Sequence, residues 1–297
     1  LLDYCNGFKD DIAEQYGTRV GVLVNYQGQL LLNGQRREGK GNSALSYDVE
    51  VAQALWSGAQ LVAVAKGGCG KGLDDQLASV LGVNADAGEP RCLYLGQLYL
   101  TQEFFEGKLR LAGGKLDLTG FFDANEVANC ENAQFLSGAL VNNPTIPFPD
   151  YAIGAVVRTE LVEGVSAQLG VADAQAVATQ TGLNTAFHDE DYAFGIFEVG
   201  VATELFGRAG NYRFMLWYDP RPLAPFDGSK SVRDDMGFAL SFDQQVSDRV
   251  TLFCRYGFAH EEVREVEHFW SVGGQLAEPI GGRTEDVLGA GVAQAIV

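Results

Sequence analysis

Most of the chain consists of short segments in which apolar and polar residues alternate. Near the start, Val20, Val22 and Val24 share one parity, while Arg19 and Asn25 share the other. Successive side chains of a β-strand point to opposite faces, so this alternation predicts a strand with one apolar face. The pattern recurs along the sequence and predicts about thirteen strands of roughly ten residues each.

Turn signals join several of the predicted strands into hairpins. Polar residues and glycine interrupt the alternation at residues 106–107, 163–164 and 207–211, and a Ser-Asp pair does so at 247–248. Such residues are favoured at the tips of tight turns between antiparallel strands. The sequence therefore predicts an all-β, antiparallel fold.

The beginning of the chain has a different period. Phe8, Ile12 and Tyr16 are spaced four residues apart, and a glycine follows them. This spacing places apolar side chains on one face of a helix, and glycine commonly ends a helix. We expect a short helix over residues 1–17 and a β-domain over residues 18–297.

Strand length and the composition of the two faces predict a membrane barrel. Strands of about ten residues can cross a bilayer at a tilt, whereas strands in soluble proteins average about five or six. One face carries large aromatic and aliphatic side chains, and the other carries Gly, Ala, Ser, Gln and charged residues. A face that stays polar over nearly every strand favours a water-filled interior. A soluble β-rich fold with one hydrated face stays as the alternative.

If the apolar side chains face outward, charged residues of several strands fall on the inner face. This parity predicts a charged lumen. The alternative is that some of these charges pair within the wall and contact no solute. The inner-face residues are Arg19, Asp48, Glu50, Arg110, Arg158, Glu198, Glu204, Arg213 and Arg255.

Charge and cysteine content exclude several classes of partner. The net charge of -18 argues against nucleic acid, which is bound by neutralising phosphates with Lys and Arg, and it suits a channel that tolerates cations. The five cysteines form no CxxC motif and pair with no histidine, which excludes a zinc site. Cys69 and Cys92 either form a disulfide beside a loop or remain free thiols, and both alternatives stay open. No apolar run approaches the roughly 18 to 20 residues of a transmembrane helix.

Two segments are similar in composition to known site motifs, but neither has the required spacing. Residues 114–135 concentrate Asp, Asn and Glu, but a calcium loop starting at Asp123 has Ala128 at its turn-glycine position and Gln134 at its closing-glutamate position. The glycine-rich residues 63–72 lack the spacing and the Ser or Thr of a phosphate loop. Neither the histidines nor the carboxylates form a recognisable catalytic set. We expect no enzymatic activity, no metal and no cofactor.

Four segments carry a family resemblance. Residues 7–17 read GFKDDIAEQYG, residues 93–150 contain a GFFDAN step and end in a proline-rich stretch, residues 210–219 read GNYRFMLWYD, and residues 284–293 read TEDVLGAGVA. Together they resemble the carbohydrate-selective, OprB-like porins of bacterial outer membranes. The resemblance implies a 16-stranded barrel in outer-membrane lipid that lets mono- and small saccharides diffuse across, narrowed by inward-folded loops.

The end of the sequence departs from the family. OprB-like porins usually continue beyond the strand near residues 284–293 and end in Phe, whereas this sequence ends at Val297. Because a barrel in lipid closes so that no strand edge is left unpaired, we expect residues 18–297 to lack the C-terminal strands. The sequence leaves both a homo-oligomer such as a trimer and a monomer open.

The predicted function is passive diffusion of carbohydrates through a charged, hydrated lumen. Arginines of the wall would donate to sugar hydroxyls, and the acidic loop would face them if it folds inward. Trp217 is a candidate platform for the apolar face of a sugar, the alternative being a packing role. A general or cation-preferring porin and a structural envelope-attachment barrel stay as alternatives. The predicted pore-lining and substrate residues are Arg110, Asp123, Asn125, Glu126, Arg158, Glu198, Arg213, Trp217 and Arg255.

Overall fold

The described residues form one antiparallel sheet of thirteen strands, each hydrogen-bonded to its neighbour in sequence. The structure is a computed structural model, and it describes residues 13, 15–32, 41–74, 76–77, 79–88, 93–186, 192–226, 231–260 and 262–297. The predicted number of strands and their antiparallel arrangement are confirmed. The strands are β1 (Thr18–Leu30), β2 (Gly41–Trp56), β3 (Ala59–Gly70), β4 (Tyr94–Phe104), β5 (Leu109–Leu116), β6 (Ala152–Val162), β7 (Val165–Asp173), β8 (Ala193–Leu205), β9 (Arg208–Asp219), β10 (Asp235–Gln245), β11 (Val250–Phe258), β12 (His268–Ala277) and β13 (Val287–Ile296).

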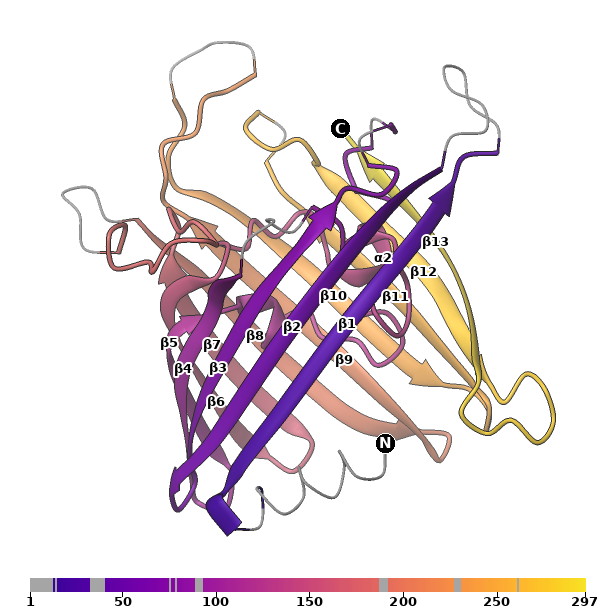
Figure 1. Cartoon of the computed structure of the whole chain (residues 1–297), viewed down its shortest axis with the longest axis horizontal. Helices are drawn as coiled ribbons and strands as arrows, with labels where there is room; N and C mark the ends of the chain where they lie inside the picture. Colours follow the sequence, from indigo (N-terminus) through magenta and orange to yellow (C-terminus); the bar gives the residue numbers. More distant parts are fainter. Residues whose placement is uncertain are drawn as a thin grey trace.

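The sheet curls around a central space, which we call the lumen (Figure 1). Within the described part of the chain, the edge strands β1 and β13 each pair with one neighbour only. Most connections at one end of the strands are tight turns, and those at the other end are longer. No helix among the described residues is long and apolar enough to span a membrane.

The predicted turns fall where the backbone needs a left-handed conformation. Turns occur at residues 106–107, 163–164 and 247–248, as predicted. The turn predicted over residues 207–211 is shorter than expected, because β8 ends at Leu205 and β9 already begins at Arg208. Phe206 and Gly207, with φ of 55° and 71°, complete that turn, as expected for a hairpin whose two central residues are left-handed.

Only the end of the predicted N-terminal helix lies within the described residues. Ala13, Gln15 and Tyr16 are helical. The Gly17 N–H donates to the Ala13 carbonyl at 3.0 Å, and Gly17 has φ of 66°. The helix therefore ends at a left-handed glycine, the usual way for a helix to stop. The rest of residues 1–17 lies outside the described part.

The convex face of the sheet is apolar, as the parity predicted. Leu169, Phe197, Leu216, Phe238 and Phe258 are directly paired across β7 to β11, forming one row. The first three of these side chains are 46%, 39% and 48% exposed. A large continuous apolar surface of this kind marks contact with lipid or with another protein. Its position on the outside of a curled sheet fits a bilayer.

The concave face is covered over part of its area by the β5–β6 connection, residues 117–151, which we call the inward loop. It contains the short helices η1 (Leu118–Gly120) and α2 (Gly138–Val141), and α2 lies inside the curl of the sheet (Figure 1). The loop and the inner face of the strands form the main core, which includes Phe122, Phe194 and Met215. This core holds the loop in the lumen.

Candidate functional site in the lumen

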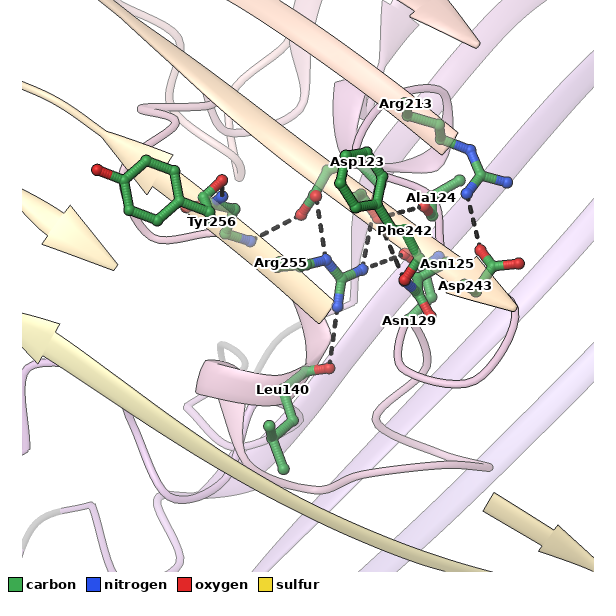
Figure 2. Close-up of polar contacts among 12 residues, drawn as sticks. Asp123, Ala124, Asn125, Asn129, Leu140, Arg213, Phe242, Asp243, Arg255 and Tyr256 are labelled. Carbon is green, nitrogen blue, oxygen red and sulfur yellow. Dashed lines mark hydrogen bonds and ion pairs between the residues drawn. The ribbon is translucent and has the colours of Figure 1, made fainter. Parts of the chain in front are cut away.

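A buried ion pair fixes the inward loop to β11. Arg255 Nε donates to Asp123 Oδ1 at 3.1 Å, and both side chains are 0% exposed. Arg255 also donates to the carbonyls of Asp123 at 2.9 Å and Leu140 at 3.3 Å, and to Asn129 Oδ1 at 3.3 Å (Figure 2). The second carboxylate oxygen of Asp123 accepts the Asn143 N–H at 2.7 Å. One arginine thus joins three separate parts of the loop to one strand.

Neighbouring polar contacts extend this anchor to β10. The Asn125 amide donates to Ser241 Oγ and to the Phe242 carbonyl, both at 3.2 Å (Figure 2). The Ser241 hydroxyl donates to the Ala124 carbonyl at 2.8 Å. Buried polar groups cost free energy unless they are hydrogen-bonded, so this satisfied network favours a single position of the loop.

Glu198 of β8 supports the loop from a nearby strand of the same wall. Its Oε2 accepts the Asp123 N–H at 3.3 Å, and its Oε1 accepts Gln168 Nε2 at 2.8 Å. The same Gln168 amide donates to the Phe121 carbonyl at 2.6 Å. The short segment from Phe121 to Asn125 is therefore attached to β7, β8, β10 and β11.

Apolar contacts fix the far end of the loop. Phe135 packs on Phe253 of β11, with ring centroids 5.8 Å apart. Leu140 belongs to the same cluster as Phe253, and Asn132 is hydrogen-bonded to Asn25 of β1. The inward loop therefore crosses the lumen, because it contacts both β11 and the edge strand β1.

A cavity of about 350 Å³ remains beside the anchored segment, near the tight-turn end of the strands; we call it the turn-side cavity. It carries charge of both signs. Arg110 of β5 and Arg158 of β6 are paired directly across the two strands, an unfavourable placement of like charges that is tolerated where water or a partner screens them. Lining side chains with polar groups include Arg110, Arg158, Glu160, Ser166, Glu198 and Arg213.

The arginines of this cavity differ in how they are held. Arg213 Nη1 is 2.9 Å from Asp243 Oδ2, and both side chains are largely buried. Arg110 Nε is 3.2 Å from Glu103 Oε1, but these side chains are about half exposed. Arg158 Nη2 donates to Ser166 Oγ at 3.4 Å. Arg213 is thus a fixed donor, while Arg110 and Arg158 keep donor groups available to a solute.

The structure divides the predicted pore-lining residues into two groups. Arg110, Arg158, Arg213 and Glu198 line the turn-side cavity, and Glu126 is exposed. Arg255, Asp123 and Asn125 do not face solvent, because the anchor buries them. Parity placed Arg255 on the inner face correctly, but it could not show that a loop covers that part of the face.

The stacking role predicted for Trp217 does not fit its surroundings. The side chain points inward as expected, but the residue is 2% exposed and lies in the main core. Gly237 is paired with it on β10, and the Arg264 guanidinium lies 5.6 Å from the ring. A covered ring offers no free face to a sugar, and its place in the core favours the packing alternative.

Three further residues contribute to the site, although they are not among the predicted pore-lining residues. Asp243 had a detectable signal, because it shares its parity with Ser241 on β10, opposite the apolar Phe242. Gln168 is an ordinary polar inner-face residue, and Phe121 sits in an irregular loop where parity gives no information. Their roles depend on the path of the inward loop through space.

The described residues contain no group of three or more His, Cys, Asp or Glu side chains placed to hold a metal. The Asp123 carboxylate, the first ligand of the rejected calcium loop, is taken up by Arg255 and Asn143. Cys69, Cys130 and Cys254 are free thiols. Cys92, the other half of the disulfide considered above, lies outside the described residues.

A single antiparallel sheet with an apolar outside, strands of 8 to 16 residues and a polar lumen narrowed by an inward loop defines a β-barrel porin. A family model for carbohydrate-selective porins, the OprB family, matches residues 40–297. The chain belongs to this family. The predicted family, fold class and bacterial outer-membrane location are confirmed, and family and fold are those of a channel rather than an enzyme.

Solved structures support the fold assignment. The high-pH structure of Pseudomonas putida OprB has a TM-score of 0.80 at 16% sequence identity, covering 98% of this chain and 78% of that one. The low-pH structure of the same protein has a TM-score of 0.63 at 14% identity, covering 99% of this chain and 82% of that one.

A sequence relative matches a shorter part of the chain. An uncharacterized protein of Aquifex aeolicus (strain VF5) is 39% identical over 101 residues, so the match spans 33% of each chain.

Proposed function

We propose that this chain forms a passive channel for mono- and small saccharides, which cross the lumen through the turn-side cavity without chemical change. The observation that carries the proposal is the mixed polar wall of that cavity, to which β5 to β9 all contribute. A sugar presents hydroxyls that both donate and accept hydrogen bonds. A wall that offers guanidinium donors beside carboxylate acceptors can replace part of the hydration shell of the sugar.

The fixed loop supports this proposal. A constriction selects among solutes only if its polar groups keep their positions while the solute passes. Here the segment beside the cavity is attached to four strands, and Arg213 is held by Asp243 at 2.9 Å. Donor groups of Arg158 and Arg110 are free to exchange between water and a sugar.

The test is ionic current through the full-length protein in planar lipid bilayers. Millimolar glucose is expected to reduce the current, while a neutral non-saccharide of similar size reduces it less. Liposome swelling with the same solutes checks that they permeate. Equal effects of the two solutes would contradict carbohydrate preference.

A second candidate is a cation-preferring diffusion channel, favoured by the net charge of -18. It predicts that, in a salt gradient, the measured reversal potential lies close to the equilibrium potential of the cation. It also predicts that glucose leaves the current unchanged. The two measurements, made on the same membrane, separate the candidates.

A further inference from the structure

Phe121 lies where two polar cavities of the lumen meet. It lines the turn-side cavity and also a second cavity of about 310 Å³, which we call the loop-side cavity. The loop-side cavity is bounded by Gln97 and Tyr99 of β4 and by Asp117, Asn129 and Glu131 of the inward loop. Phe121 is the residue that the two linings have in common.

The ring is held at this boundary and is not free to fold away. Phe121 is half-buried, and the Tyr99 ring packs edge-on against it, with centroids 6.0 Å apart and planes at 71°. Its carbonyl accepts the Gln168 amide at 2.6 Å, and its N–H donates to the Leu118 carbonyl at 3.0 Å.

The next residue in the sequence, Phe122, is packed into the wall. Phe122 is 0% exposed, and it packs so closely on β7 that a Cβ added at Gly170 would lie 2.6 Å from a ring carbon. Two aromatic residues adjacent in sequence therefore divide their roles. Phe122 fills the wall, whereas Phe121 is only partly buried against the same core and lines both cavities.

A pyranose has a rim of hydroxyls and an apolar face of C–H groups. An aromatic ring beside polar partners matches both parts, because the ring covers the apolar face while the hydroxyls keep hydrogen bonds. Carboxylates and amides lie on one side of Phe121, and arginines and glutamates lie on the other. Trp217, the other candidate, is covered.

We propose that Phe121 is the stacking platform that sets the preference for sugars, held in place by its T-shaped contact with Tyr99. This inference rests on the proposed function and adds the residue that distinguishes a sugar from other polar solutes of its size. An aliphatic side chain of similar bulk would fill the same volume without offering a flat face.

The test compares Phe121→Leu and Phe121→Tyr with the wild-type protein in planar bilayers. Phe206→Leu is the matched control, because Phe206 is fully exposed in the β8–β9 turn and lines neither cavity. We expect Phe121→Leu to raise the glucose concentration for half-maximal block by about threefold to tenfold. Phe121→Tyr and Phe206→Leu should keep the wild-type value. Heat-modifiable gel mobility and open-channel conductance show that each variant has folded.

The outcomes separate this inference from the function on which it rests. If glucose blocks the wild type and Phe121→Leu equally in folded channels, the stacking role is overturned and the carbohydrate channel stands. If glucose blocks neither and does not permeate, the proposed function itself fails. Phe121→Tyr keeps the aromatic ring, so stacking predicts that its glucose block is unchanged. If both Phe121→Leu and Phe121→Tyr weaken glucose block equally, the effect does not depend on an aromatic face, and the inference is overturned.

Discussion

At the scale of single residues, the chemistry of Arg255 is determined by the loop that covers it. The guanidinium has no contact with solvent and uses three of its nitrogens on the inward loop. Removing one partner of such a pair leaves the other charge buried without compensation, which typically costs about 3–5 kcal/mol. Asp123 is therefore a structural residue despite its acidic, loop-borne sequence context.

Asp123→Asn is expected to lower stability and to release the loop. The unfolding midpoint in urea should fall by an amount corresponding to about 3 kcal/mol or more, and open-channel conductance should rise and become noisier. Asp248→Asn is the matched control, because Asp248 pairs with Arg208 in an exposed turn and exposed pairs contribute little. Equal effects of the two substitutions would show that the anchor does not hold the loop.

Arg158→Gln tests the lumen wall. It removes a charged donor from the turn-side cavity while leaving the anchor intact, so glucose block should weaken by about threefold to tenfold. Arg208→Gln removes an arginine that lines neither cavity, and it should leave the block unchanged. The measurement is the concentration dependence of current reduction.

The inner-face arginines show what a single sequence could and could not predict. Alternation placed Arg110, Arg158, Arg213 and Arg255 on one face, and the structure agrees, because strand parity is a local property. Whether an inner-face group meets water depends on a loop that arrives from far away in the sequence. Arg255 and Arg158 have the same parity signal and opposite environments.

At the scale of elements, the strands and turns were predictable and the path of the inward loop was not. Period-two alternation and turn residues predicted thirteen strands, and most turns fell within a residue or two of their expected places. Residues 117–151 contain only two short helical segments. Their course is determined by contacts such as Phe122 on β7, which no local pattern encodes.

Gly170 and Gly195, on the neighbouring strands β7 and β8, allow a matched test of how tightly the loop packs. A Cβ at Gly170 would lie 2.6 Å from the Phe122 ring, whereas one at Gly195 would meet no atom within 4 Å. Gly170→Ala should destabilise the protein by about 1–3 kcal/mol through overpacking, and Gly195→Ala should leave stability nearly unchanged. Urea unfolding of the detergent-folded protein measures both; similar midpoints would contradict tight packing.

At the scale of the whole molecule, the outer apolar row determines where the protein resides. Leu169→Arg would place a charge on the convex face, at a cost of about 2–4 kcal/mol near the bilayer midplane. Folding into phosphatidylcholine vesicles should become less efficient, as seen by tryptophan fluorescence and gel mobility. Phe206→Arg, in the exposed turn, is the control and should fold as the wild type does; unimpaired folding of Leu169→Arg would argue against a lipid-facing row.

The anchor also has a consequence for the order of events during assembly. Strand pairing follows the sequence throughout, so the sheet can grow by adding one hairpin after another with short loop closures. The Asp123–Arg255 contact, by contrast, joins residues 132 positions apart. The contacts to β7, β8 and β10 can form earlier, but the buried ion pair of the inward loop cannot form until β11 has been added. An assembly intermediate that lacks β11 therefore lacks the buried ion pair that fixes the inward loop, and strand-by-strand assembly would complete this anchor only at a late step.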